Sequence, residues 1–159
     1  MKNWLFRKQN QIFILLIIIL CSCLFIFIVN KNNSDNYVLI NNHKILVELA
    51  DTDKLREKGL SGRSNLPENR GMLFIFPQER IYSFWMKEML IPLDIIWIKN
   101  NKIVDYHQNV PFPEPGITND KLKTYSPKEP VDKVLEVNAG TIEKIKINTG
   151  DNITVKGYN

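Results

Sequence analysis

The chain has 159 residues, 44% of them hydrophobic, with 21 basic and 17 acidic side chains and a formal net charge of +4. This length accommodates one domain with an appendage and excludes two ordinary domains. Lys2, Arg7 and Lys8 precede every acidic residue, and the chain beyond them has 18 basic and 17 acidic residues. That part is nearly neutral, so its charge gives no reason to expect a nucleic-acid partner.

The first predicted element is an apolar segment at residues 12–29, in which Ser22 is the one polar side chain. A helix of this length spans roughly 27 Å, close to the thickness of the bilayer hydrocarbon. Residues 1–11 carry only positive charge, whereas Lys31 and Asp35 balance each other after the segment. The positive-inside rule therefore predicts a cytoplasmic stub at residues 1–11 and a domain outside a bacterial cytoplasmic membrane, on its periplasmic or extracellular side.

Three modes of attachment remain open. Both cysteines, Cys21 and Cys23, lie inside the apolar segment. The stretch Leu20-Cys21-Ser22-Cys23 resembles a lipobox and makes Cys23 a candidate for lipidation, but the apolar run continues to Val29 and favours an uncleaved transmembrane anchor. A cleaved signal is the third alternative. Each places a cysteine-free domain outside the cytoplasm, which excludes a disulfide, a thiolate zinc site or a cysteine nucleophile there.

A polar tether at residues 30–36 precedes the domain at residues 37–159 and reaches at most about 25 Å. Strands are expected at residues 37–40 and 44–49, with Asn41-Asn42 as the hairpin turn between them. Asp51-Thr52-Asp53 then offers side-chain caps for a short helix that continues to Lys58 and ends at Gly59 or Gly62.

The remaining segments are mostly β-like. The expected strands are residues 72–76 (closed by Pro77), 81–86, 91–98, 103–106, 134–137 and 153–156. Between them we expect a turn at Asn100-Asn101, a proline-rich loop from residue 111 to about 122 and a helical turn at residues 141–144. Helices are too few to cover both faces of a parallel sheet. The sequence predicts a small mixed or antiparallel sheet curled into a barrel, with one or two short helices, behind an N-terminal transmembrane helix.

Six blocks in order resemble one known family. They are residues 47–52, Arg56 with Lys58-Gly59-Leu60, Gly71-Met72-Leu73-Phe74 with Phe76-Pro77, Phe84-Trp85-Met86-Lys87, residues 91–96, and residues 135–140 with Gly150-Asp151. Together these blocks, over about residues 45–156, resemble the domain of unknown function 192 family (DUF192, of the UPF0127 type). The resemblance implies a compact β pseudo-barrel of mixed strands and frequent N-terminal export signals, with no established reaction, cofactor or ligand. Ser61-Gly62-Arg63 departs from the family pattern, in which bulkier residues precede the arginine.

Phe84-Trp85-Met86-Lys87 is the densest candidate for binding chemistry. Strand alternation would place Trp85 and Lys87 on one face, where an aromatic ring beside a cation suits sugars or carboxylates. The alternative is core packing in which the Lys87 stem extends over Trp85.

Asp94 and Arg63 are the other candidates for ligand binding. Asp94 lies inside an apolar strand, so it is either a ligand-orienting acceptor or base, or a structural group that pairs with Lys87, Arg63 or backbone N–H groups at a bulge. Arg63 lies in a glycine-rich stretch at residues 59–71, and its guanidinium fork suits carboxylates and phosphates. The glycine spacing does not match a phosphate-binding loop.

The leading hypothesis is a non-catalytic domain that binds a small molecule, glycan or peptide through Arg63, Trp85, Lys87 and Asp94. The alternatives are an envelope hydrolase that uses Asp94, or a structural or assembly partner of an envelope complex. His43 and His107 have no ligand partner nearby in the sequence, and no catalytic signature is visible, so neither a metal site nor a cofactor is expected. The expected partners are the membrane, through residues 12–29, and a small ligand or an envelope protein.

Overall fold

The computed structural model describes residues 36–158, and two asparagine pairs form the turns of its β-hairpins. Asn41 and Asn42 have φ of 48° and 64°, and Asn100 and Asn101 have φ of 49° and 62°. Two successive positive φ angles are typical of the two-residue turn that matches strand twist, and asparagine tolerates them. The first pair joins β1 (Tyr37–Ile40) to β2 (His43–Ala50), and the second joins β5 (Leu93–Lys99) to β6 (Lys102–Val110), which confirms both predicted turns.

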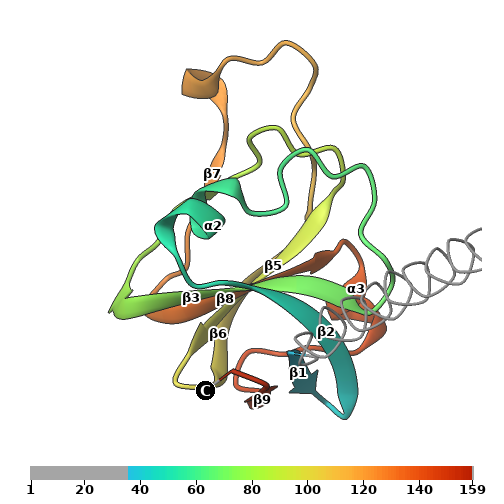
Figure 1. The fold of residues 1–159 in the computed structure, drawn as a ribbon, viewed down its shortest axis with the longest axis vertical. Helices are drawn as coiled ribbons and strands as arrows, with labels where there is room; N and C mark the ends of the chain where they lie inside the picture. The colour runs from blue at the N-terminus through green and yellow to red at the C-terminus, as the bar shows by residue number, and fades with distance from the viewer. Residues whose placement is uncertain (1–35, 159) are drawn as a thin grey trace, which may run out of the picture. The chain divides into compact units, whose positions relative to one another are not determined.

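Seven strands form one sheet in the order β6-β5-β8-β3-β2-β1-β9, where β3 is Arg70–Arg80, β8 is Val131–Asn138 and β9 is Ile153–Lys156. β2 and β3 are parallel and the other neighbours are antiparallel. The sheet curls so far that its edge strands meet at one end (Figure 1). There the Ile103 N–H donates to the Asp151 carbonyl at 2.9 Å, and the Ile153 N–H donates to the Asn101 carbonyl at 2.8 Å. This curled half-barrel confirms the predicted mixed β fold.

Two apolar clusters cover the two faces of the sheet. The cluster inside the curl takes buried side chains from all seven strands and from α3 (Thr141–Lys144), among them Ile40, Val47, Leu73, Ile96, Ile103, Leu135, Ile142 and Ile153. The other cluster lies on the opposite face of β3, β5 and β8, where the segments that follow α2 (Asp53–Lys58) and the small sheet of β4 (Phe84–Trp85) and β7 (Thr124–Tyr125) cover it. This second cluster includes Leu60, Met72, Phe74, Met86, Ile95, Trp97 and Tyr125. The candidate site lies in this covered face.

Local sequence signals explain the boundaries of α2. The Thr52 side chain accepts the Leu55 N–H at 3.3 Å, and Gly59 ends α2 with a φ of 48°. A threonine N-cap and a glycine with positive φ are the usual boundaries of a helix. α3 is the single helical turn predicted at residues 141–144.

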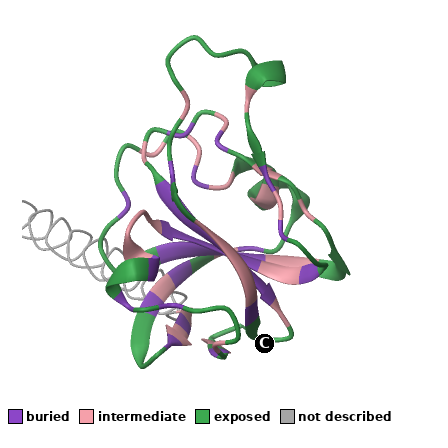
Figure 2. Ribbon diagram, turned by 180° about the vertical axis from the view of Figure 1, so that it is seen from behind, coloured by how far each residue is buried: buried purple, intermediate pink, exposed green. Residues whose placement is uncertain are grey.

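Several expected boundaries were wrong. β3 does not end at Pro77 but continues to Arg80, with a shift in its register against β8 between Ile75 and Arg80. Proline has no N–H to donate to the ladder, and the irregularity accommodates it. The strand expected at residues 81–86 is limited to β4, and β6 extends to Val110. The loop after β6 contains a 3-10 turn, η1 (Asn119–Lys121), and is exposed over most of its length (Figure 2).

The segment expected to span a membrane, residues 12–29, lies outside the described residues, as does Cys23. Within residues 36–158, no helix is both long enough and apolar enough to cross a bilayer.

Candidate functional site: an aromatic pocket over Glu136

Glu136 is a carboxyl group in the middle of the sheet. Side chains alternate along β8, so Leu135 and Val137 enter the cluster inside the curl while Val134 and Glu136 face the covered side. The register places Glu136 opposite Met72 of β3 and opposite Ile95 of β5. An acid is therefore held between two apolar neighbours at the centre of a buried face.

The Glu136 side chain has no visible compensation for its burial. The residue is 5% exposed, and its Oε2 atom is buried without a hydrogen-bond partner. Burial raises the pKa of Glu136 to about 8, because a low-polarity environment disfavours the charged form. A buried polar atom without a partner costs about 1–3 kcal/mol. Natural proteins rarely retain an unpaired buried polar group, and the few that they retain often lie at functional sites.

A pocket with a volume of about 280 Å³ lies against Glu136, between the covered face of the sheet and the layer formed by α2 and β4. Half of its fourteen lining residues have apolar or aromatic side chains, namely Leu60, Phe74, Phe76, Tyr82, Phe84, Trp85 and Met89. The polar side chains on its rim are Arg56, Glu57, Lys58, Ser61 and Ser83. An apolar cavity with a few convergent polar groups is the usual form of a small-ligand site.

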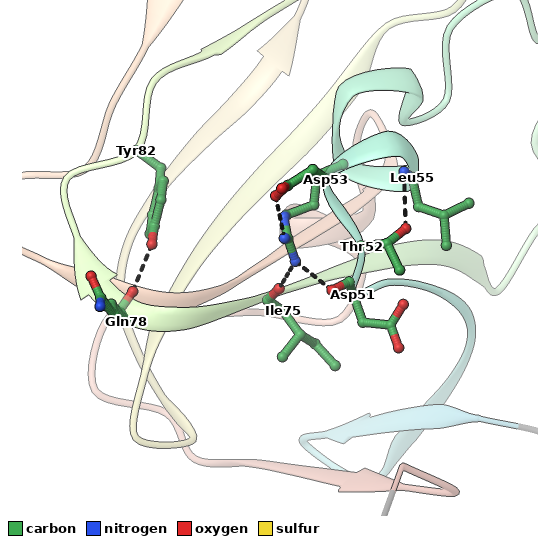
Figure 3. A network of polar contacts seen from close by, with 8 residues as sticks. Asp51, Thr52, Asp53, Leu55, Ile75, Gln78 and Tyr82 are labelled. Atoms are coloured by element: carbon green, nitrogen blue, oxygen red, sulfur yellow. Dashed lines mark hydrogen bonds and ion pairs between the residues drawn. The ribbon is translucent and has the colours of Figure 1, made fainter.

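The rings of the pocket support one another. Phe84 packs edge-to-face on Phe74, with ring centroids 4.9 Å apart, and on Trp97 at 5.3 Å. Phe76 and Tyr82 are stacked at 3.6 Å. The Tyr82 hydroxyl donates to the Gln78 carbonyl at 2.6 Å (Figure 3). The wall is therefore built from mutually packed side chains.

Arg56 fixes α2 over the pocket. Its Nη1 donates to the carbonyls of Asp51, at 2.7 Å, and Ile75, at 2.6 Å, while its Nη2 pairs with the Asp53 carboxylate at 2.6 Å. Figure 3 shows these three partners around one guanidinium group. Since Ile75 belongs to β3, the contacts tie the helix to the sheet, and the charge of Arg56 is neutralised by Asp53.

Trp85 is the one predicted ligand-binding residue that lines this pocket. It is 47% exposed at the rim, and the Lys87 Nζ atom lies 5.5 Å from its ring centroid. The Lys87 ammonium group therefore lies over an exposed ring that is not part of the core, and Lys87 does not itself line the pocket.

Arg63 and Asp94 are held elsewhere. Arg63 forms a two-pronged ion pair with Glu48, at 2.5 and 2.6 Å, and this hydrogen-bonded pairing lowers the pKa of Glu48. Asp94 is fully buried and accepts the backbone N–H groups of Asn109 and Ile142, each at 2.8 Å. Asn109 has a φ of 51° beside a register shift between β5 and β6, and Ile142 is in the first turn of α3. Asp94 thus links a bulge to a helix terminus, and the four predicted residues do not converge.

Glu136 was not among the four residues predicted to bind a ligand, although the sequence contains a signal for it. Val134, Leu135 and Val137 surround it, so β8 is apolar on both faces and a carboxyl group in it must be buried. The same pattern singled out Asp94. The difference between the two acids is their pairing, which depends on backbone groups from distant segments.

Within residues 36–158, no group of three or more histidine, cysteine, aspartate or glutamate side chains is placed to hold a metal ion. His107, one of the two histidines, accepts the Trp97 indole N–H on its Nδ1 atom at 2.9 Å. Burial lowers the pKa of His107, which favours the neutral ring that this hydrogen bond requires.

Residues 37–155 match the model of the DUF192 family, described as "Uncharacterized ACR, COG1430". The chain belongs to the DUF192 family. It is 32% identical over 111 residues to a UPF0127 protein of Thermococcus gammatolerans and 30% identical over 111 residues to one of Thermococcus kodakarensis. Each match covers 68% of this chain, but only 65% and 63% of the respective relative, which is less than two thirds of its length.

Two solved structures share the DUF192 fold seen here. One, from Sinorhizobium meliloti 1021, is described as a candidate transcription regulator; it has a TM-score of 0.67 and 31% identity, over 77% of this chain and 93% of that chain. The other, a protein of unknown function from Novosphingobium aromaticivorans, has a TM-score of 0.65 and 28% identity, over 75% of this chain and 82% of that chain. The descriptions of these four relatives name no ligand.

Proposed function

We propose that this DUF192 domain binds a small molecule in the Glu136 pocket. One observation carries the proposal: the buried Glu136 Oε2 atom has no partner although it borders a cavity lined with aromatic side chains. Most buried polar groups are paired, and a ligand would supply the missing partner. The ring contacts of Phe84 and the Arg56 tether of α2 support the same proposal, because they form the cavity in advance and lower the cost of binding.

The site of this proposal differs from the four residues expected from the sequence. Trp85 remains part of the proposed site as a rim residue. Arg63, Lys87 and Asp94 are replaced by Glu136 and the aromatic side chains of the pocket. Asp94 is excluded as its polar centre, because both its oxygens accept backbone N–H groups and it does not line the pocket. That pairing gives no support to a hydrolase that uses Asp94.

The setting of the domain is a separate part of the proposal. The apolar segment at residues 12–29 and the positive charge before it support attachment to the bacterial cytoplasmic membrane, with the pocket on the outer side. The near balance of charge beyond the segment gives no basis for a nucleic-acid partner, so the description of the Sinorhizobium meliloti relative is not extended to this chain.

The test is a fragment screen of the full chain in lipid nanodiscs, read by ligand-observed NMR and by the shift in unfolding temperature. A ligand that binds only the folded state raises that temperature. Trp85→Ala should weaken the hits, whereas Phe112→Ala should not, because Phe112 is similarly exposed, at 49% against 47%, and does not line the pocket. Hits that respond equally to both variants, or no hits beyond empty nanodiscs, would refute the proposal.

A further inference from the structure

We infer that the Glu136 pocket binds a protonated amine carried on a small apolar body, with the Glu136 carboxylate as its counter-ion. This inference rests on the proposed function, because it names the ligand class of the same pocket. Three features of the pocket support it: the unpaired Glu136 carboxyl group, the aromatic side chains of the lining and the charges around the cavity.

The carboxyl group lacks a donor and a positive charge. Its neighbours across the sheet, Met72 and Ile95, are apolar, and its Oε2 atom has no hydrogen bond. A buried carboxylate is costly unless it is paired and hydrogen-bonded. An ammonium group has up to three N–H donors and a positive charge, so it meets both requirements at once. A neutral ligand meets only the first.

The rings favour the same ligand. A cation is attracted to the face of an aromatic ring within about 6 Å of its centroid. The rim already shows this preference, since the Arg56 guanidinium carbon lies 5.5 Å from the centroid of Phe76, and the Lys87 Nζ atom lies 5.5 Å from that of Trp85. The pocket that borders Glu136 has five aromatic side chains in its lining.

The charges of the lining do not oppose a cation. Arg56 is neutralised by Asp53 at 2.6 Å, and Lys58 and Glu57 carry opposite charges on α2. The segment after β3 contributes the Tyr82 hydroxyl, which already donates to the Gln78 carbonyl, and β3 and β5 contribute apolar side chains opposite Glu136. Lys58 has no ion pair among residues 36–158, but it is exposed on α2, and neither it nor Arg56 donates a hydrogen bond to the buried Glu136 Oε2 atom.

The size of the cavity limits the apolar body. A volume of about 280 Å³ is near the lower limit, about 300 Å³, of pockets that hold drug-sized ligands. One ring or a short alkyl chain with a terminal amine is of suitable size. The side chain of a lysine in a peptide has the same chemistry as a free alkylamine, so both sources need to be compared.

The experiment titrates the full chain in nanodiscs with benzylamine by calorimetry, beside benzyl alcohol and phenylacetate as neutral and anionic analogues of similar size. Free Glu136 is mostly protonated at pH 7, so an amine must displace its proton. We expect close to one proton released per benzylamine, detected as a dependence of the heat on the buffer. The affinity should rise about tenfold from pH 6 to pH 7 and level off above pH 8.

Matched variants locate the effect. Glu136→Gln should weaken benzylamine binding at least tenfold, and Glu114→Gln, the same change at an exposed residue outside the pocket lining, should leave it within twofold. The proton-release measurement uses the wild-type protein alone, so it remains decisive if Glu136→Gln does not fold. Two further probes distinguish a peptide lysine from a free alkylamine as the natural ligand. A site for peptide lysine binds Nα-acetyl-lysine methylamide more tightly than n-butylamine, and a site for free amines binds n-butylamine more tightly.

Two results would overturn the inference differently. Binding of benzyl alcohol or phenylacetate as tight as that of benzylamine, or an affinity that falls as pH rises, would show that neutral Glu136 donates a hydrogen bond; the pocket would still be a ligand site. No binding of any of the three probes at millimolar concentration, together with an empty fragment screen, would remove the proposed function as well.

Discussion

Glu136 makes the stability of the domain depend on pH in a direction opposite to that of most paired carboxylates. Its pKa is about 8 in the folded state against an ordinary value of 4.5. The folded protein therefore holds this proton more tightly than the unfolded chain does, so the stabilisation is complete below about pH 4.5 and is lost as the pH rises through 8. Between pH 6 and pH 9 we expect a loss of about 2 to 3 kcal/mol in the free energy of unfolding.

Urea unfolding of the full chain in a non-ionic detergent, compared with Glu136→Gln, measures this loss. The difference between the two proteins isolates Glu136, because the contribution of His107 is present in both. His107 acts with the opposite sign, since its lowered pKa makes its contribution complete above about pH 6.5 and lost as the pH falls. Parallel pH profiles for the two proteins would show that Glu136 is not a buried neutral acid.

Asp94 is the contrasting acid, and its role is structural. Asp94→Asn keeps the shape but replaces one accepting oxygen by an NH₂ group that faces a backbone N–H donor. Because hydrogen bonds to charged groups contribute about 1.5 to 3 kcal/mol each, we expect a loss of about 3 kcal/mol, measured by urea unfolding at pH 7. Asp120→Asn, in the exposed turn η1, is the control and should change stability by less than about 0.5 kcal/mol. Equal effects at the two positions would contradict the structural role.

At the scale of the elements, the close approach of β3 and β8 sets the position of Glu136. A Cβ atom on Gly71 would lie 2.5 Å from the Glu136 carbonyl oxygen and 2.9 Å from the Val137 Cγ1 atom. Gly71→Ala must therefore push the two strands apart, and we expect a loss of about 1 to 3 kcal/mol in urea unfolding together with a weaker amine affinity.

Gly116→Ala is the matched control for the strand contact. Gly116 has a φ of 83° but has no heavy atom within 4 Å of an added Cβ. The strain of its backbone should cost about 1 kcal/mol and leave ligand affinity unchanged, because its loop does not line the pocket. A change in amine affinity for Gly116→Ala, or none for Gly71→Ala, would argue against the coupling of β3 and β8 to the site.

The elements that follow from the sequence are those whose signals are local. The Asn41-Asn42 and Asn100-Asn101 turns and the Thr52 cap depend on neighbouring residues alone, so their positions were predicted within one residue. The course of β3 through Pro77 depends on its pairing with β8, and the two-residue strands β4 and β7 depend on each other. The pocket was missed for the same reason, since its lining comes from α2, β3, β4 and β8 together.

At the scale of the whole domain, scaffold and site occupy opposite faces of one sheet. The face inside the curl packs apolar side chains from all seven strands, and Asp94, the other buried acid, is fully paired there through α3. The covered face holds the one buried acid of residues 36–158 whose carboxyl oxygen lacks a partner. Because of this separation, we expect substitutions in the pocket lining to disturb the curled sheet less than substitutions on the face inside the curl.

The attachment of the domain remains a prediction that labelling can test. The sequence beyond residue 23 has no cysteine, so Asp120→Cys introduces a single exposed thiol into the domain. With an anchor at residues 12–29 and the N-terminus inside, we expect this thiol to react with a membrane-impermeant maleimide in intact spheroplasts. An N-terminal epitope should stay on the membrane-bound protein, and Cys23→Ser should not release it. Loss of the epitope with release of the domain would indicate a cleaved signal, loss of the epitope from a domain that stays on the membrane a lipoprotein, and an unreactive thiol the opposite orientation.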